Sequence, residues 1–163
     1  MPRLNKQINS GYLASKWMQL IKHSLERGAR LFLFVPYIGQ VGPLVYLLEK
    51  MFSVSVKGTS SQDPQRTETV KNFRAGLIQL LVTTTILERG VTVPFVDVYI
   101  LDADSQQFDS AALIQMAGRA GRSQQDPNGF VYFCAADWTS SQEAAVQQIR
   151  DMNRRASKAG AHA

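Results

Sequence analysis

The sequence predicts an α/β fold, a three-layer sandwich in which a mostly parallel sheet is covered by helices on both faces. Three observations predict it. Short apolar runs that suit buried strands alternate with segments of helical periodicity along the chain. The 163 residues suffice for one domain with a full apolar core. Hydrophobic residues make up 45% and charged residues 19%, which argues against a mainly disordered chain.

Each element follows from its local pattern. A helix is expected at 9–27, because apolar residues recur there near helical spacing and Gly28 can end it. A buried strand is expected at 31–35, because that run is continuously apolar and Pro36 closes it. The same patterns, with capping residues, predict the other elements in order: helix 39–52, strand 54–56, helix 64–73, strand 78–83, short helix 85–89, strand 96–101, helix 110–120, strand 129–135 and a helix from 140. The domain is expected to cover 1–152, with a basic, frayed tail at 153–163.

The net charge of +5 is concentrated at the two ends of the sequence. Residues 1–30 hold six basic residues and one acidic residue, and residues 150–163 hold four basic residues and one acidic residue. This distribution permits a polyanionic partner without requiring one, since solvated ends are often charged. No apolar run reaches the length of a membrane span, and the N-terminus shows no secretory signal. The single cysteine, Cys134, lies in an apolar run, where burial is expected.

The stretch Gln115-Met116-Ala117-Gly118-Arg119-Ala120-Gly121-Arg122 carries the most information. Its two arginines are three residues apart and therefore share one side of a helical turn. Its two glycines are unfavourable inside a helix, which favours a helix end that another molecule can approach closely. Guanidinium groups suit phosphate oxygens. The alternative is a helix C-terminus whose arginines only complement the helix dipole. The sequence contains neither of the two common phosphate-binding motifs, Gly-x-x-x-x-Gly-Lys-Ser/Thr and Gly-x-Gly-x-x-Gly.

This stretch resembles motif VI of superfamily-two helicases, Gln-x-x-Gly-Arg-x-Gly-Arg. The segment 83–94 resembles motif V, and 31–36 resembles the motif IV strand. The residues at 83–94, and those from Asp104 that precede Gln115, are most similar to the corresponding residues of the ComFA-type DNA-uptake helicases of competent Gram-positive bacteria. The resemblance implies a RecA-like fold, that of the second domain of a P-loop NTPase helicase. Many relatives carry an acidic residue where this chain has Thr92, so a contact with the nucleotide ribose is in question there.

The resemblance also implies roles for individual residues. Arg122 would be the arginine finger, Arg119 a second phosphate-facing arginine, and Gln115 part of the same network. Four residues would lie near the nucleotide: Gly90, Glu88, Gly118 and Thr92. Four would contact the nucleic-acid backbone: Thr84, Thr85, Ser60 and Ser61. For Glu88 a solvated helix residue remains an equal alternative, and for Thr84 and Thr85 ordinary capping at a strand end remains open.

The implied activity is that of an ATP-dependent DNA helicase or translocase for DNA uptake in competence. ATP and Mg²⁺ would be bound mainly by a first RecA-like domain absent from this sequence, so the chain alone is expected to be inactive. No metal site is expected here. Expected partners are single-stranded DNA, the first domain, and other DNA-uptake proteins at the membrane. The expected location is cytoplasmic, without membrane insertion. Two alternatives stay open: a repair, replication-restart or RNA helicase, and a non-catalytic nucleic-acid-binding domain. The two arginines favour a working motor.

Overall fold

The sheet has five parallel strands in the order β2-β3-β1-β4-β5. The computed structural model describes residues 2–84, 93, 95–120 and 129–161. The strands are β1 (Arg30–Phe34), β2 (Val56–Thr59), β3 (Leu80–Thr83), β4 (Val96–Leu101) and β5 (Val131–Cys134). All four strand pairings are parallel, which confirms the predicted sheet.

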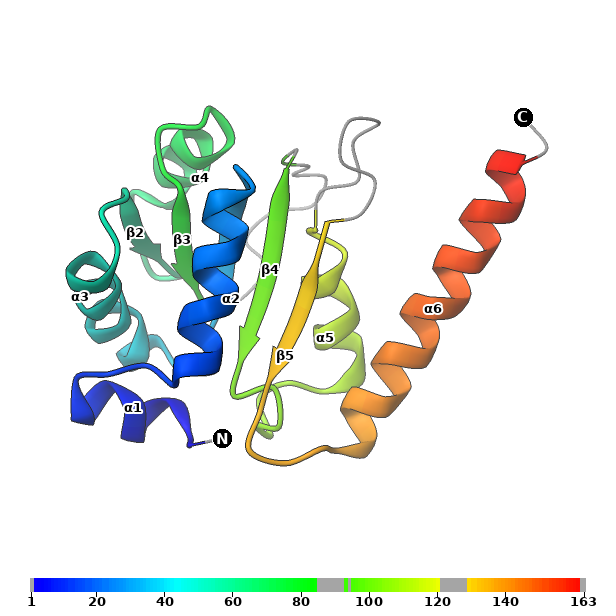
Figure 1. Ribbon diagram of the computed structural model, residues 1–163, viewed down its shortest axis with the longest axis horizontal. Helices are drawn as coiled ribbons and strands as arrows, with labels where there is room; N and C mark the ends of the chain where they lie inside the picture. The colour runs from blue at the N-terminus through cyan, green and yellow to red at the C-terminus, as the bar shows by residue number, and fades with distance from the viewer. Residues whose placement is uncertain (1, 85–92, 94, 121–128, 162–163) are drawn as a thin grey trace.

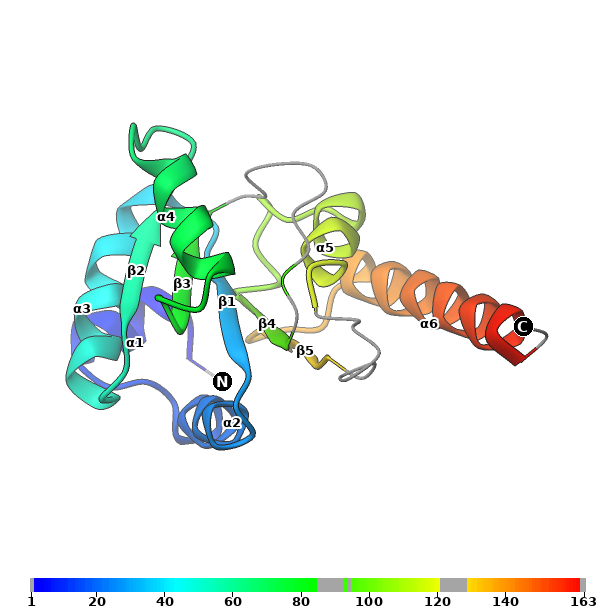
Figure 2. The ribbon, with the colours of Figure 1, turned by 90° about the horizontal axis from the view of Figure 1, so that it is seen from above.

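Helices cover both faces of this sheet, because successive strand residues point to opposite sides. On β1, Leu31 and Leu33 pack in one core cluster while Phe32 and Phe34 pack in the other. The first cluster includes side chains of α1 (Leu4–Ser10), α2 (Ser15–Glu26) and α3 (Val41–Met51). The second includes side chains of α4 (Arg66–Arg74), α5 (Ser110–Ala117) and α6 (Ser140–Ala161). The two sets of helices lie on opposite sides of the sheet (Figures 1 and 2), so the three-layer sandwich is confirmed.

The N-terminal segment differs from the single helix expected at 9–27. It forms α1 and α2, separated by a turn at Gly11, whose φ of 79° is left-handed and ends α1. Gln7 is buried and holds this turn: its Oε1 accepts from the backbone N–H of Ala14 at 2.6 Å, and its Nε2 donates to the Pro2 carbonyl at 2.7 Å. The apolar spacing alone does not reveal this break, because Leu13 is buried in the turn itself.

Several element boundaries also differ from expectation, among them those of β2, α4 and α5. Strand β2 covers 56–59 and not 54–56, because α3 packs directly on its backbone at Gly58. A Cβ at Gly58 would lie 2.5 Å from Cγ1 of Val41, so only glycine fits under the helix. Helix α4 begins two residues after Pro64, since the Asp63 carboxylate accepts from the Gln65 N–H at 2.9 Å and forms a turn first. Helix α5 ends at 117 and not at 120.

Helix α2 contacts the sheet through a hydrogen bond as well as through apolar packing. Trp17 and Ile21 of α2 are buried in the core, and the Ser24 and Tyr99 hydroxyls hydrogen-bond at 2.7 Å. Burial raises the pKa of the Tyr99 hydroxyl, although this hydrogen bond acts in the opposite direction. Cys134 is buried as expected, and burial raises the pKa of its thiol to about 12. A thiol held neutral in this way is a packing residue.

The last helix begins against α5 and then extends away from the sheet in both ribbon views (Figures 1 and 2). It continues to Ala161 and so includes most of the stretch 153–163 for which we expected fraying. The division of the chain at residue 152 stays a prediction. Within the described part of the chain, no helix has both the length and the apolar character needed to cross a bilayer.

Candidate functional site

Helix α5 positions the described part of the predicted phosphate-facing motif. The residue before it, Asp109, caps the helix: its side chain accepts from the Ala112 N–H at 2.8 Å. The side chains that pack inward share a helical stripe: Leu113, Met116, Ala117 and Ala120. Gln115 and Gly118, three residues apart, are exposed on the opposite side. The helix therefore exposes Gln115 and Gly118 on one side, while its other side packs in the core.

The end of α5 is compact but leaves Gly118 open. The backbone N–H of Arg119 donates to the Met116 carbonyl at 3.1 Å, which tightens the last turn. Gly118 has φ −65°, so its backbone does not require glycine. Among the described residues, a Cβ there would meet the carbonyl oxygens of Gln115 and Ile114, at 3.4 and 3.5 Å. The described residues therefore give no packing reason for a glycine at this position.

Arg119 is half-buried where this last turn meets the body of the domain. Burial lowers the pKa of its guanidinium from the usual value, although arginine stays charged at any physiological pH. A partly desolvated guanidinium interacts more strongly with an anion than a fully hydrated one does. The site is therefore suited to bind phosphate oxygens. In the described ranges, no group of three His, Cys, Asp or Glu side chains could hold a metal ion.

Five of the predicted site residues lie outside the described residues: Thr85, Glu88, Gly90, Thr92 and Arg122. The short helix expected at 85–89 lies outside them as well. Their roles stay predictions from the motif.

The predicted nucleic-acid-facing residues that the structure describes lie together at the carboxyl edge of the sheet. Thr59 of β2 pairs in register with Thr83 of β3, so Ser60 and Thr84 leave neighbouring strands at the same level. Both are buried, while Ser61 is exposed. The Ser60 hydroxyl accepts from the Gln62 N–H at 3.3 Å, which leaves it able to donate to another group.

Asp63 stabilises the loop that follows β2. The Thr59 hydroxyl donates to the Asp63 carboxylate at 2.7 Å, and the same carboxylate accepts from the Gln65 N–H. Both hydrogen bonds lower the pKa of the Asp63 carboxyl, and the one from Thr59 has the larger effect. The loop that carries Ser60 and Ser61 is thus held by side chains at both ends.

The two sets of motif residues occupy opposite edges of the sheet. We expected functional groups to collect at the carboxyl ends of the strands, as is usual in such sheets. That expectation is wrong for Gln115, Gly118 and Arg119. Helix α5 follows the carboxyl end of β4 and runs back to the level where β5 begins. Its C-terminal end therefore lies at the amino edge (Figure 1).

Sequence reasoning missed a buried ion pair at this amino edge. Asp97 of β4 is fully buried and forms a salt bridge with Arg27, while its Oδ1 also accepts from the Phe130 N–H at 3.0 Å. The Arg27 guanidinium lies 4.9 Å from the centroid of the Phe130 ring. The pair fixes the start of β5 to β4 and to the end of α2. Its only signal in the sequence is an acidic residue inside the apolar run 96–101.

Fold and motif residues together define the class: this is a RecA-like second domain of a superfamily-two helicase. The model of the helicase conserved C-terminal domain matches residues 14–124, and the chain belongs to that family. It is 36% identical over 160 residues to the competence protein ComFA of Bacillus subtilis, covering 94% of this chain and 33% of that protein. It is 34% identical over 153 residues to ComFA of Streptococcus pneumoniae, covering 93% of this chain and 35% of that protein. The predicted resemblance to ComFA-type helicases is confirmed.

A solved structure supports the fold. RecG bound to a three-way DNA junction matches with a TM-score of 0.63 and 20% identity, covering 83% of this chain and 18% of that chain. At that identity the likeness concerns the fold alone. The chain spans about a third of the length of both ComFA relatives.

Proposed function

We propose that this chain is the second motor domain of an ATP-dependent DNA translocase that takes part in DNA uptake during competence. The observation that carries the proposal is the separation of two chemically different edges on one sheet. A half-buried arginine and an open glycine lie at the amino edge, and hydroxyl residues lie at the carboxyl edge. A motor needs this arrangement, because nucleotide and nucleic acid must be bound at once by different surfaces.

At the amino edge, Arg119 and Arg122 would face the phosphates of ATP bound by a first RecA-like domain. Positive charge fixed beside the transferring phosphoryl group stabilises the charge that develops in the transition state. Gln115 would orient the two guanidiniums, and Gly118 and Gly90 would allow the backbone to come close. Glu88 and Thr92 would lie nearby. The donors on this edge are cationic or neutral, so they suit phosphate oxygens, and Mg²⁺ would be held by carboxylates of the first domain.

At the carboxyl edge, Ser60, Ser61, Thr84 and Thr85 would contact the phosphates of single-stranded DNA. Hydroxyls and backbone amides bind phosphate without reading the base, which suits movement along any sequence. The similarity to two competence proteins supports DNA uptake over repair, replication restart or RNA remodelling. We expect the protein to act in the cytoplasm and to meet other DNA-uptake proteins at the membrane.

The test is DNA-stimulated ATP hydrolysis by the protein that holds both RecA-like domains. Arg119→Ala should remove most of the hydrolysis while single-stranded DNA still binds in a fluorescence anisotropy titration. Loss of DNA binding together with hydrolysis would show that the two edges do not have separate tasks. Unchanged hydrolysis would refute the assignment of the amino edge.

A further inference from the structure

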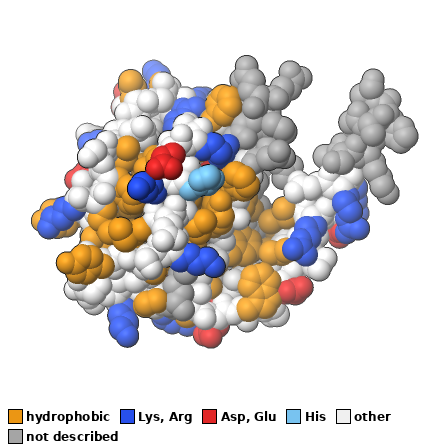
Figure 3. Space-filling view, viewed as in Figure 1, with side chains coloured by type: hydrophobic (Ala, Val, Ile, Leu, Met, Phe, Trp, Pro, Cys, Tyr) orange, Lys and Arg blue, Asp and Glu red, His pale blue; other side chains and the backbone are white. Residues whose placement is uncertain are grey.

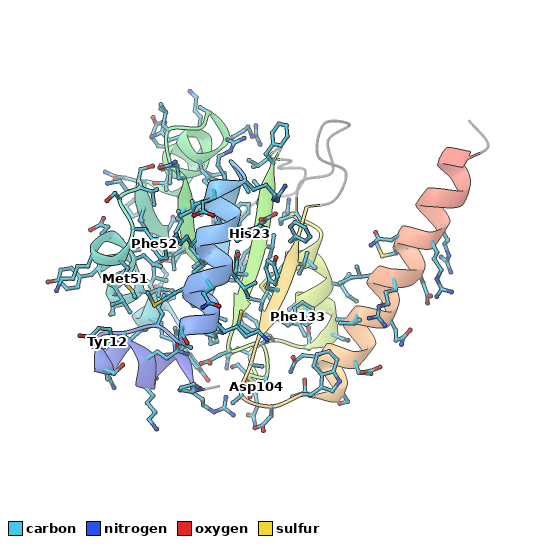
Figure 4. All side chains as sticks on the ribbon, viewed as in Figure 1. Tyr12, His23, Met51, Phe52, Asp104 and Phe133 are labelled. Atoms are coloured by element: carbon cyan, nitrogen blue, oxygen red, sulfur yellow. The ribbon has the colours of Figure 1, made fainter. Side chains whose placement is uncertain are left out.

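A groove of about 530 Å³ runs along the outer edge of β5, between α2 and α6. Figure 3 shows hydrophobic side chains in the hollow beside α6, with Lys and Arg side chains at its borders. Figure 4 labels Phe133, which lies on the side of β5 toward α5 and α6. The main apolar lining residues are Trp17, Leu20, Phe133, Trp138, Val146 and Ile149.

The floor of this groove is an open strand edge. In the described part of the chain, β5 pairs with β4 alone. The carbonyls of Phe130 and Cys134 face β4, where they accept from the N–H groups of Val98 at 2.8 Å and Ala103 at 3.1 Å. Because peptide groups alternate in direction along a strand, those of Val131 and Phe133 point into the groove. Such an edge offers both donors and acceptors to another strand.

The charged residues that line the groove are basic, although Glu143 lies beside it and accepts from the Trp138 indole N–H at 2.8 Å. Lys16 on α2 and Arg150 on α6 stand on its two walls, and its described lining residues include no acidic side chain. Apolar side chains are available on both faces of the strand edge, as a strand with alternating side chains requires. From these observations we propose that the groove binds an extended segment of a partner protein, with apolar residues and acidic flanks, as an added strand beside β5.

Two other occupants fit less well. Single-stranded nucleic acid matches the positive charge, but its backbone has no N–H groups to satisfy the outward carbonyls of Val131 and Phe133. A second copy of the chain would pair edge with edge and bring Lys16 and Arg150 of both copies to one interface, where like charges repel. A peptide with acidic flanks satisfies both the backbone groups and the charges.

The fluorescence of the chain's own tryptophans can report binding in this groove. Its two tryptophans, Trp17 and Trp138, both line the groove, and Trp138 is 59% exposed. The experiment titrates the purified chain with a synthetic peptide in which Val alternates with Thr between terminal Glu residues. We expect a blue shift of tryptophan emission and protection of Trp138 from iodide quenching. A peptide with Lys in place of Glu should bind much more weakly.

Charge reversal provides the first set of variants. Lys16→Glu and Arg150→Glu should each lower the affinity for the Glu peptide by about tenfold, the value of one charge-assisted contact. The same variants should gain affinity for the Lys peptide. Lys22→Glu is the matched control, because Lys22 is exposed on α2 but does not line the groove. Equal binding of both peptides, or an equal effect of Lys22→Glu, would overturn the proposal.

A backbone variant tests the added strand itself. Val131→Pro removes an N–H that points into the groove, without removing a bond to β4. It should abolish the emission shift while the melting temperature stays close to that of the wild-type chain. If Val131→Pro unfolds the chain, the same peptide carrying a central proline replaces it as the test and should not bind. The proposal is overturned if no Glu peptide shifts the emission, if an oligonucleotide produces the same protection, or if protein concentration alone does so through dimer formation.

Discussion

The backbone N–H of Leu4 donates to Oδ1 of Asp102 at 3.0 Å and so ties the first helix to the turn after β4. Asp102 adopts a left-handed φ of 51° there and is 7% exposed. Beside it, Arg3 forms a salt bridge with Asp104 at 3.1 Å (Figure 4, where Asp104 is labelled). The N-terminal helix is therefore attached at the carboxyl edge by one buried and one exposed polar contact.

The Asp102 contact makes stability depend on pH. Burial raises the pKa of Asp102, while the Leu4 N–H acts in the opposite direction. Folding thus favours the protonated carboxyl. The resulting stabilisation of the fold is complete when the pH is below the unfolded-state pKa of Asp102. It is lost as the pH rises through the higher folded-state pKa. Asp102→Asn keeps an acceptor for Leu4 and tolerates the left-handed conformation. We expect it to raise the free energy of unfolding at neutral pH.

Urea denaturation at a series of pH values provides the measurement. The wild-type chain should lose stability relative to Asp102→Asn as pH rises through the acidic range just above the usual Asp pKa. Asp109→Asn, at the exposed cap of α5, is the control and should not reproduce this difference. Parallel pH profiles of wild type and Asp102→Asn would contradict the prediction.

The two members of the buried ion pair, Arg27 and Asp97, should differ in what their removal costs the fold. Asp97→Ala leaves the Phe130 N–H without its acceptor, so we expect a loss of about 1–3 kcal/mol in the free energy of unfolding. Arg27→Ala should cost more, because it leaves the fully buried Asp97 carboxylate without its cation. A double-mutant cycle measured by chemical denaturation separates the pair from the single contributions. Equal losses for the two single variants would refute this order.

Arg122 is predicted to act on the transition state of ATP hydrolysis. In the protein with both RecA-like domains, Arg122→Ala should lower kcat by roughly 10³-fold or more and change KM little. Arg122→Lys should not restore the rate, since a flexible ammonium does not reproduce the planar guanidinium. Arg155→Ala, an exposed position on α6, is the control. Wild-type turnover in Arg122→Ala, with a small loss of thermal stability, would instead indicate a residue that only complements its helix end.

The chain alone should not hydrolyse ATP, because its sequence holds no phosphate-binding loop. A phosphate-release assay with single-stranded DNA present provides the measurement. Addition of the separate first RecA-like domain should restore turnover. Robust activity of the purified 163-residue chain would show that its nucleotide site is complete without a second domain.

Single-stranded DNA should bind the isolated domain weakly and lose affinity steeply as salt rises, because few phosphate contacts carry the binding. Ser61→Ala, at the exposed end of the β2 loop, should weaken binding at low salt equally for all sequences. Ser140→Ala, exposed at the start of α6, is the control. Fluorescence anisotropy at low and physiological salt gives the comparison. Tight binding that survives high salt would point to a reader of base sequence.

The sequence predicts the central strands well because their signal is local. Apart from Arg30 and Asp97, the strands β1 and β4 consist of buried apolar and aromatic residues, and the structure places them within one residue of the expected ranges. Strand β2 has no such signal, since Lys57 and Gly58 suit a loop as well as a strand. Its position depends on the packing of α3 against Gly58, which is a contact between distant segments.

The candidate site likewise contains residues that can be found from local sequence and contacts that depend on distant segments. Gln115, Gly118 and Arg119 can be found from their spacing, because they lie within five consecutive residues at the end of α5. The pairing of Arg27 with Asp97 cannot, since 70 residues separate them and only the folded sheet brings them together. The break at Gly11 also depends on a tertiary partner, the buried side chain of Gln7.

The run of α5 from one edge of the sheet to the other has a mechanical consequence. A strand of six residues such as β4 spans about 20 Å, and five hydrogen-bonded strands resist bending along that length. The domain should therefore move as a rigid body, with the two proposed binding edges at opposite ends of the strands. If Arg119 contacts the nucleotide and Ser60 and Thr84 contact DNA as proposed, a small rotation at the Arg119 end would displace the other end by an amount proportional to strand length. The step size of such a motor would be set by the sheet as much as by the chemistry.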